Sequence, residues 1–237
     1  MHPIESLIIL DDESPIRKAQ YIGDTVDAKN FLDFYIYNCS KALSALTSSV
    51  RKSKLSLSML DSEVIALVRL EDASKSSYIE YMVENCFIRI QSIYDRVLIL
   101  VNRILNLGLA NESISHNIMV TNDNVKIWGL DSSLKKINKS CNEFRFIRNT
   151  VIHHDRYNEE ELNKLLLIID ADHRLKEAGR ESSFDEKEIE AATSDYLEIK
   201  KSALDDYLEK ILQNIESLYD ELIPLYKYQK IKLRENV

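Results

Sequence analysis

Hydrophobic residues recur every three or four positions along most of this chain, a spacing typical of helices that bury one face. Between residues 25 and 53 the recurring positions are Ala28, Leu32, Tyr35, Cys39, Ala42 and Leu46. A shorter run follows at Leu57, Leu60, Val64 and Leu67. The pattern predicts a long helix followed by a short one.

The longest hydrophobic run predicts a central helix that ends at Gly108. Ser77 and Glu80 have the spacing of a capping box, which predicts where this helix begins. Its buried row is Val83, Cys86, Ile90, Ile93, Val97, Leu100, Ile104 and Leu107. A second row, Phe87, Tyr94, Leu98, Val101 and Leu105, widens the apolar face, so we expect neighbours on two sides.

The rest of the chain predicts two more amphipathic helices and two irregular stretches. Residues 110–130, which include Trp128, and the charged residues 176–188 are expected to be exposed, mobile connections. Helices are expected at about 159–175 and from about 186 to Pro224. The last has its apolar stripe at Leu204, Leu208, Ile211, Ile215, Leu218 and Leu222, and a basic tail, 225–237, follows with Lys227, Lys230, Lys232 and Arg234. We therefore predict a single all-α domain over 1–237, an antiparallel bundle of long helices with its core at about 25–222.

Composition narrows the function. The chain has 237 residues with only four glycines and three prolines, and the isolated glycines form neither a dinucleotide-binding turn nor a P-loop. A net charge of −8 argues against coating duplex nucleic acid with the whole surface. Three cysteines on the apolar stripes suit reduced thiols in a cytoplasm, and neither a secretory signal nor a membrane span is expected. The histidines and carboxylates form no organised metal-ligand pattern, so we predict no metal and no cofactor.

One arginine interrupts an otherwise apolar seam. A helix expected from Leu134 carries this seam through Ile137, Cys141, Phe144, Arg148 and Val151. Burying a guanidinium on such a seam is costly, so Arg148 must face a carboxylate, an anionic ligand or a wet gap between subunits. Asn149 and His153 are four residues apart and share a helix face.

The run FIRNTVIHH, residues 146–154, resembles the R-[polar]-x(3–5)-H motif of the HEPN superfamily of helical bundles. The resemblance spans about residues 77–175. It implies a metal-independent endoribonuclease, a toxin or defence effector, that cuts single-stranded RNA at a site assembled across a homodimer. Arg148 would then clamp the phosphate, His153 would transfer protons and Asn149 would orient the phosphate or the histidine. His154 has the alternative spacing, so either histidine can be the working residue.

Other residues complete the predicted site. Residues 134–156 carry six basic side chains against two acidic ones, and we expect Lys139, Arg145 and Arg156 to contact RNA. Glu84 and Tyr157 are auxiliary candidates. In some HEPN toxins a partner nucleotidyltransferase modifies a tyrosine two residues after the histidine. Asp155 occupies that position here, which argues against this mode of control, although an antitoxin or regulatory partner remains part of the prediction.

Four alternatives stay open. The lysines can form a solvated helix face, and Arg148 can belong to a buried network with Glu84 or Asp95. The bundle can be a catalytically silent HEPN-like module that binds a nucleotide, RNA or a protein. It can also be a structural interaction domain without a ligand.

Overall fold

A computed structural model describes residues 2–23, 25–67, 74–147, 149, 157–182 and 184–235. These residues divide into two compact units. Unit 1 comprises residues 1–50, 92–142 and 210–237, and unit 2 comprises 51–91 and 143–209. Three of the four boundaries fall inside the three longest helices, α2 (Phe31–Ser58), α4 (Lys75–Ile104) and α10 (Glu186–Glu235), and the fourth follows Asn142. The single domain stays a prediction, and each unit is described by itself.

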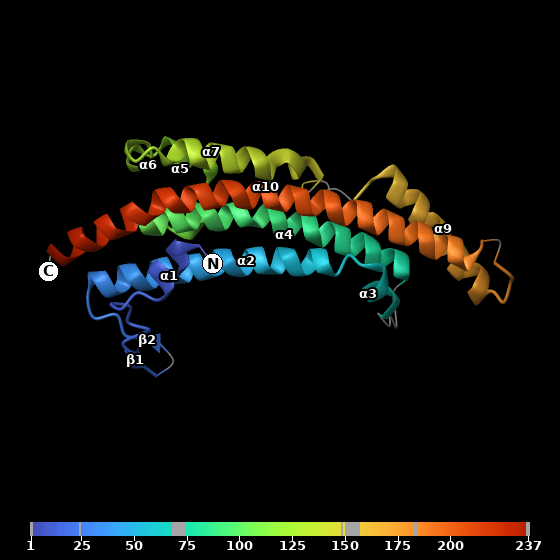
Figure 1. The fold of residues 1–237 in the computed structure, drawn as a ribbon, viewed down its shortest axis with the longest axis horizontal. Coiled ribbons are helices and arrows are strands. Elements are labelled where there is room, and N and C mark those ends of the chain that lie inside the picture. The colour runs from blue at the N-terminus through green and yellow to red at the C-terminus, as the bar shows by residue number, and fades with distance from the viewer. Residues whose placement is uncertain are drawn as a thin grey trace. The chain divides into compact units, whose positions relative to one another are not determined.

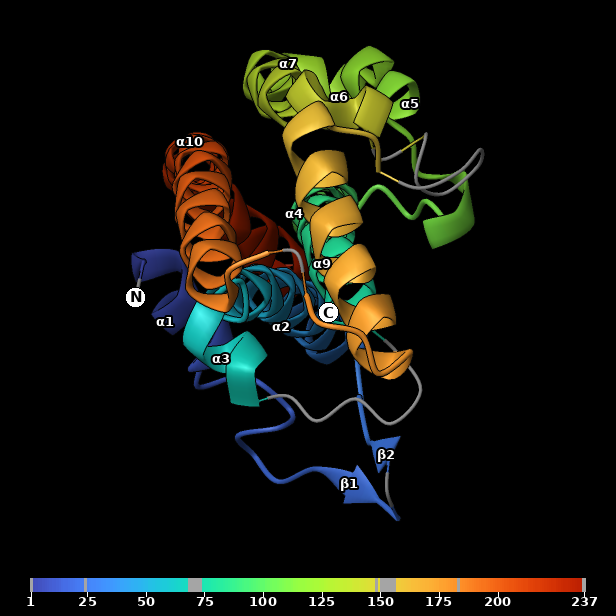
Figure 2. The ribbon, with the colours of Figure 1, turned by 90° about the vertical axis from the view of Figure 1, so that its right-hand side faces the viewer.

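Unit 1 is helical apart from one short hairpin. It begins with α1 (Pro3–Ile9), followed by β1 (Tyr21–Ile22) and β2 (Thr25–Val26), which pair antiparallel. The predicted apolar stripes are buried in the first part of α2, the second part of α4 and the second part of α10. The remaining elements are the 3₁₀ turn η1 (Asn111–Ser113) and the helices α5 (His116–Thr121), α6 (Asp123–Ile127) and α7 (Leu130–Cys141). The last three lie together as one group (Figures 1 and 2).

Unit 2 holds the ends of the same long helices with two further ones. It contains α3 (Ser62–Leu67), the 3₁₀ turn η2 (Asn142–Phe144) from its second residue, and α9 (Glu160–Glu177). Its core is formed by fully or nearly fully buried side chains of α4 and α10, among them Ile79, Val83, Cys86, Phe87, Ile90, Leu204 and Leu208. The all-α prediction is confirmed.

Most positions of the predicted stripes are buried as expected, but the prediction is wrong for Leu67, the last position of the second run, which is 82% exposed. The first seven residues of the central row, Val83 to Ile104, have no exposed surface. Cys39, Cys86 and Cys141 are free and buried, and desolvation by burial is the main cause that raises each thiol pKa, to about 12 for Cys86 and Cys141.

The prediction of an irregular stretch at 110–130 is wrong. The segment forms η1, α5 and α6, and the side chains of Ser115 and Asn122 accept hydrogen bonds from the first turns of these two helices. Helices of five and six residues are too short to show a period. The capping side chains of Ser115 and Asn122 therefore mark where these two helices begin, which the hydrophobic pattern does not show.

The predicted end of the last helix is also wrong. Pro224 lies inside α10, and the residues of the expected tail are helical as far as Glu235. Pro224 and Asp220 are both exposed, so water can satisfy the Asp220 carbonyl that proline leaves without its intrahelical donor. Beyond the proline, Leu225 and Tyr226 are buried, which favours continuing the helix.

The expected helix starts differ by a few residues. At α4 it is the Ser74 hydroxyl, and not Ser77, that accepts a backbone hydrogen bond, from the Ser77 N–H at 3.2 Å. The helix expected from Leu134 begins earlier, as α7 at Leu130, and the chain enters it through Gly129 with φ of 72°. The charged connection between α9 and α10 is confirmed as non-helical over residues 178–182, 184 and 185.

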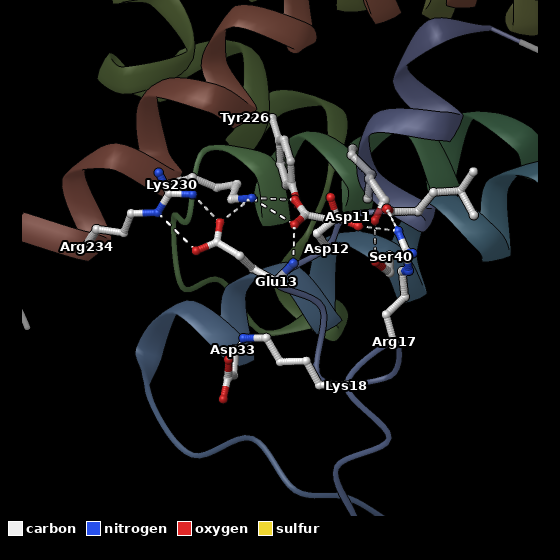
Figure 3. A network of polar contacts seen from close by, with 12 residues as sticks. Asp11, Asp12, Glu13, Arg17, Lys18, Asp33, Ser40, Tyr226, Lys230 and Arg234 are labelled. Carbon is white, nitrogen blue, oxygen red and sulfur yellow. Dashed lines mark hydrogen bonds and ion pairs between the residues drawn. The ribbon is translucent and has the colours of Figure 1, made fainter.

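A clasp of charged side chains holds the N-terminal segment of unit 1 against α10 (Figure 3). Asp11 accepts hydrogen bonds from the Tyr226 hydroxyl at 2.7 Å and from the Lys230 ammonium at 2.6 and 2.8 Å. Lys230 also lies 2.8 Å from Glu13, which pairs in turn with Arg234. Lys230 and Arg234 of the expected basic tail are therefore neutralised within the fold.

Candidate functional site

The motif lies in unit 2 between two described flanks. Asn149 is helical and half-buried, and residues 145–147 before it are also helical, with Arg145 and Phe146 exposed. Arg148, His153, His154 and Arg156 lie outside the described residues, and so does Val151 of the predicted seam. The structure therefore describes Asn149 and the residues on either side of the motif, up to 147 and from 157.

The upstream flank is not the continuous helix that the seam predicts. The α-helical turns end at Cys141, and the chain continues as the 3₁₀ turn η2 before residues 145–147 become helical again. A change from 3.6 to about three residues per turn rotates the side chains that follow. The strict three-four spacing from Leu134 through Cys141 to Phe144 therefore does not lie on one continuous α-helix.

The two flanks of the motif meet on one aromatic side chain of α4. The ring of Phe87 lies 5.3 Å from the ring of Phe144, before the motif, and 5.3 Å from the ring of Tyr157, after it. Phe144 also contacts Tyr207 of α10 edge-on at 4.7 Å. Offset and edge contacts at these distances are favourable. Both ends of the 145–156 segment are thus fixed to the same core of unit 2.

The downstream flank is held by a partly buried hydrogen-bond network. Glu84 of α4 accepts the backbone N–H of Tyr157 at 2.7 Å. Lys200 of α10 donates to the Tyr157 hydroxyl at 3.1 Å and to Glu159 at 2.5 Å. The Tyr196 hydroxyl donates to the other oxygen of Glu159 at 2.7 Å. We call these five residues the exit network, because they fix the chain where it leaves the motif.

Burial and charge set the protonation of this network. Desolvation raises the pKa of Tyr157 well above its usual range, and the neighbouring Glu159 carboxylate adds to the effect. The Lys200 side chain is 13% exposed and lies over the Tyr157 and Tyr196 rings at 5.5 and 5.7 Å. Its charge is thus compensated by a carboxylate and two ring faces. Tyr157 acts as a neutral structural anchor.

The other predicted site residues have separate surroundings. Lys139 is exposed on α7 in unit 1, and Arg145 is exposed in unit 2. The Glu84 carboxylate accepts a hydrogen bond from the Tyr157 backbone N–H. Glu84, predicted as an auxiliary site residue, therefore holds the chain where it leaves the motif. Asp95, the other carboxylate considered for Arg148, is exposed on α4 in unit 1.

The described residues contain no group of three or more histidine, cysteine or carboxylate side chains arranged to hold a metal ion. Within the same part of the chain, none of the helices combines the length and apolar character needed to cross a membrane.

Comparison with protein families gives the decisive match. The family model for HEPN_Cthe2314-like HEPN matches residues 35–223, about four fifths of the chain. The chain belongs to this HEPN family. The match includes both flanks of the R-N-x(3)-H motif and the whole exit network, so these features lie inside the HEPN region. Neither the search of curated proteins nor the search of solved structures found a match.

Within this HEPN chain, sequence reasoning missed Lys200, Glu159 and Tyr196. Lys200 lies 43 residues after Tyr157, and in sequence it is one of many charged residues on a long amphipathic helix. Phe87 did carry a signal, because it belongs to the second apolar row of α4. Its role as the common contact of both motif flanks requires the fold.

Proposed function

We propose that this HEPN protein is a metal-independent endoribonuclease that cuts single-stranded RNA at a site shared by two copies of the chain. The supporting observation is that Arg148, Asn149 and His153 form an R-N-x(3)-H motif inside the family match, in a segment whose two ends both contact Phe87. A segment fixed at both ends presents its side chains with less loss of conformational entropy on binding.

The residues of the motif supply what the reaction needs. Cleavage begins when the 2′-hydroxyl of a ribose loses its proton to a base and its oxygen attacks the adjacent phosphorus. The bond to the 5′-oxygen breaks, and that oxygen takes up a proton from an acid, which leaves a 2′,3′-cyclic phosphate. An unperturbed imidazole changes charge near neutral pH, so His153 can serve as base in one copy and as acid in the other, while His154 is the alternative. Arg148 clamps the phosphate oxygens and Asn149 orients them.

An assay in EDTA tests this chemistry. Purified protein is incubated with end-labelled single-stranded RNAs of varied sequence, and products are examined for cyclic phosphate ends. We expect cleavage to persist, and we expect His153→Ala and Arg148→Ala each to lower its rate by roughly 10²-fold or more. His173→Ala, at an exposed histidine of α9, is the matched control and should cut like the wild type.

Two results would reject the ribonuclease. These are the absence of cleavage on every RNA tested, and equal rates for the wild type and the two alanine variants. A silent HEPN-like module that binds a nucleotide, RNA or a protein would then take its place. His154→Ala, measured beside His153→Ala, identifies the working histidine by the larger loss.

The shared site requires a homodimer in which two motifs approach the two-fold axis. Light scattering at micromolar concentration should give twice the mass of the 27.5 kDa chain. A monomer that still cuts RNA would contradict the shared site.

As a toxin or defence effector in the cytoplasm, the protein would need a partner that restrains it. Tyr157 is buried, so we expect restraint by binding and not by modification of this tyrosine.

A further inference from the structure

We infer that unit 1 carries a binding site for the bases of single-stranded RNA, formed by two adjoining grooves beside the end of α4. The site is separate from the motif and from the residues proposed for catalysis. The choice of RNA as its ligand rests on the proposed function. The grooves, their lining residues and their charge are features of unit 1 that do not depend on the proposed function.

The first groove exposes two aromatic rings that the fold does not use. It has a volume of about 320 Å³ and is lined by Phe31, Phe34, Tyr35, Asn38, Asn102, Arg103, Asn106, Gly108 and Leu233. Phe31 is 81% exposed and Phe34 57% exposed, although they stand in the first turn of a helix whose Leu32 and Tyr35 are buried. Exposed phenylalanine rings contribute nothing to the core, and they offer flat surfaces on which bases stack.

The second groove continues the first and adds another aromatic pair. It has a volume of about 210 Å³ and shares Asn106 and Leu233 with the first groove. Its other lining residues are Leu105, Asn124, Trp128, Gln229 and Lys232. Trp128 is 42% exposed and packs on the half-exposed ring of Tyr228 at 5.5 Å. Aromatic rings therefore stand in or beside both grooves.

The end of α4, which lines both grooves, is held by its own hydrogen bonds. The Asn102 side chain donates to the Leu109 carbonyl at 2.9 Å and accepts from its N–H at 3.3 Å. The Leu107 N–H donates to the Asn102 carbonyl at 3.1 Å, and Asn106 adopts φ of 51° to close the helix end. A corner held by these bonds keeps Arg103 and Asn106 in place, which lowers the entropic cost of binding.

The polar groups of the grooves suit bases and phosphates. Amides of Asn38, Asn106 and Asn124 can each donate and accept, as the edges of unpaired bases require. None of the described residues that line either groove is acidic, although the whole chain carries a net charge of −8. Arg103 and Lys232 place cationic side chains in the lining, and Arg103 donates one N–H to Asn111 and carries four other N–H donors. Lys230 and Arg234 of the same helix α10 are held by Asp11 and Glu13 (Figure 3).

Trp128 is the only tryptophan of the chain, so its fluorescence reports on the second groove directly. The chain with Arg148→Ala, used to prevent cutting, is titrated with a twelve-nucleotide oligouridylate. We expect saturable quenching. Adding Phe31→Ala and Phe34→Ala together should weaken the Kd by about tenfold or more, because stacking on each ring is lost. Asn106→Gly keeps the backbone conformation without strain, removes the amide and should weaken the Kd about fivefold.

Tyr81→Ala is the matched control, since Tyr81 is an aromatic residue 61% exposed in unit 2. It should bind the oligouridylate like its parent. Absence of quenching would overturn the inference, as would an unchanged Kd in the Phe31/Phe34 double variant. If the double variant instead turns a dimer into a monomer in light scattering, a second copy of the chain covers this face, which also overturns it.

The binding and cleavage results can be told apart. Quenching by oligouridylate without any cleavage by the wild type would reject the ribonuclease and leave the binding site standing. Cleavage of long RNA that is as fast in the Phe31/Phe34 variant as in the wild type, with unchanged Kd, would reject the binding site and leave the ribonuclease standing.

Discussion

The two units use the same three chemical groups in their buried polar networks, but for different ends. The clasp of unit 1 joins Tyr226, Lys230 and Asp11, and the exit network of unit 2 joins Tyr157, Lys200 and Glu159. Each lysine side chain is 13% exposed and lies against a tyrosine. In the clasp, however, the carboxylate is the shared acceptor, whereas in the exit network the lysine is the shared donor.

This difference shows what each network fixes. Asp11 lies in the N-terminal segment, 215 residues from Tyr226, so the clasp holds a terminus. Tyr157 is the first described residue after the motif, so the exit network holds the chain next to the proposed catalytic residues. We therefore expect damage to the clasp to lower stability alone and damage to the exit network to lower stability and RNA cleavage together.

The largest effect is expected from Tyr157→Ala. The change removes a ring that is 5% exposed and packed on Phe87, which should lower the free energy of unfolding by about 4 kcal/mol. Cleavage at a temperature where the variant is folded should fall as well, because the exit of the motif loses its anchor. Urea unfolding and the RNA assay measure the two effects. Tyr81→Ala is the control, and an equally small loss of stability in both variants would contradict the role of the exit network.

Lys230→Met should have the next largest effect. It leaves the buried Asp11 carboxylate without its cation, and removing one partner of a buried pair costs about 3 kcal/mol. Cleavage measured on the folded variant should be unchanged, since the clasp supports unit 1 and not the motif. Lys227→Met, at an exposed lysine one turn earlier, should unfold like the wild type. Loss of cleavage by the folded Lys230→Met chain would erase the distinction between the networks.

The sequence predicts the elements of both units better than it predicts either network. Helical periods reveal α2, α4 and α10 because each repeats its stripe over many turns, and one row of α4 is completely buried. Periods fail for α5 and α6, which span less than two turns, and at Pro224, where burial of Leu225 and Tyr226 outweighs the local preference. The stripe from Leu134 misleads because a 3₁₀ turn interrupts it.

The candidate site was found in sequence through a local motif, whereas its supports are not local. Arg148, Asn149 and His153 are within six residues of one another. Glu84 lies 73 residues before Tyr157, whose backbone N–H donates a hydrogen bond to it. Lys200 lies 41 residues after its partner Glu159. The partners of these charged residues are decided by helix packing, which no spacing along the chain encodes. In the sequence they are indistinguishable from solvated surface charges.

A smaller effect separates the two tyrosine hydroxyls. Tyr226→Phe removes a donor from the buried carboxylate of Asp11, which should cost about 2 kcal/mol, the size of a hydrogen bond to a charged group. Tyr157→Phe removes only an acceptor from Lys200, which retains Glu159 at 2.5 Å, so about 1 kcal/mol is expected. Urea unfolding of the two variants gives both values. A larger loss for Tyr157→Phe would show that the hydroxyl, and not the ring, is the main anchor of the exit.

The smallest effect concerns acid and distinguishes the clasp by its pH dependence. The hydrogen bond from Arg234, helped by Lys230, lowers the pKa of Glu13 to about 2 from an ordinary value above 4. A carboxyl whose pKa is lower in the folded chain stabilises the fold at neutral pH, and this contribution disappears as the pH falls from about 4 to about 2. Glu13→Gln removes the contribution at every pH. The wild type and this variant should therefore differ by less than about 1 kcal/mol at pH 7 and converge near pH 2. Urea unfolding across this range gives the two curves, and a difference that stays constant down to pH 2 would show that Glu13 stabilises the clasp by packing and not by its charge.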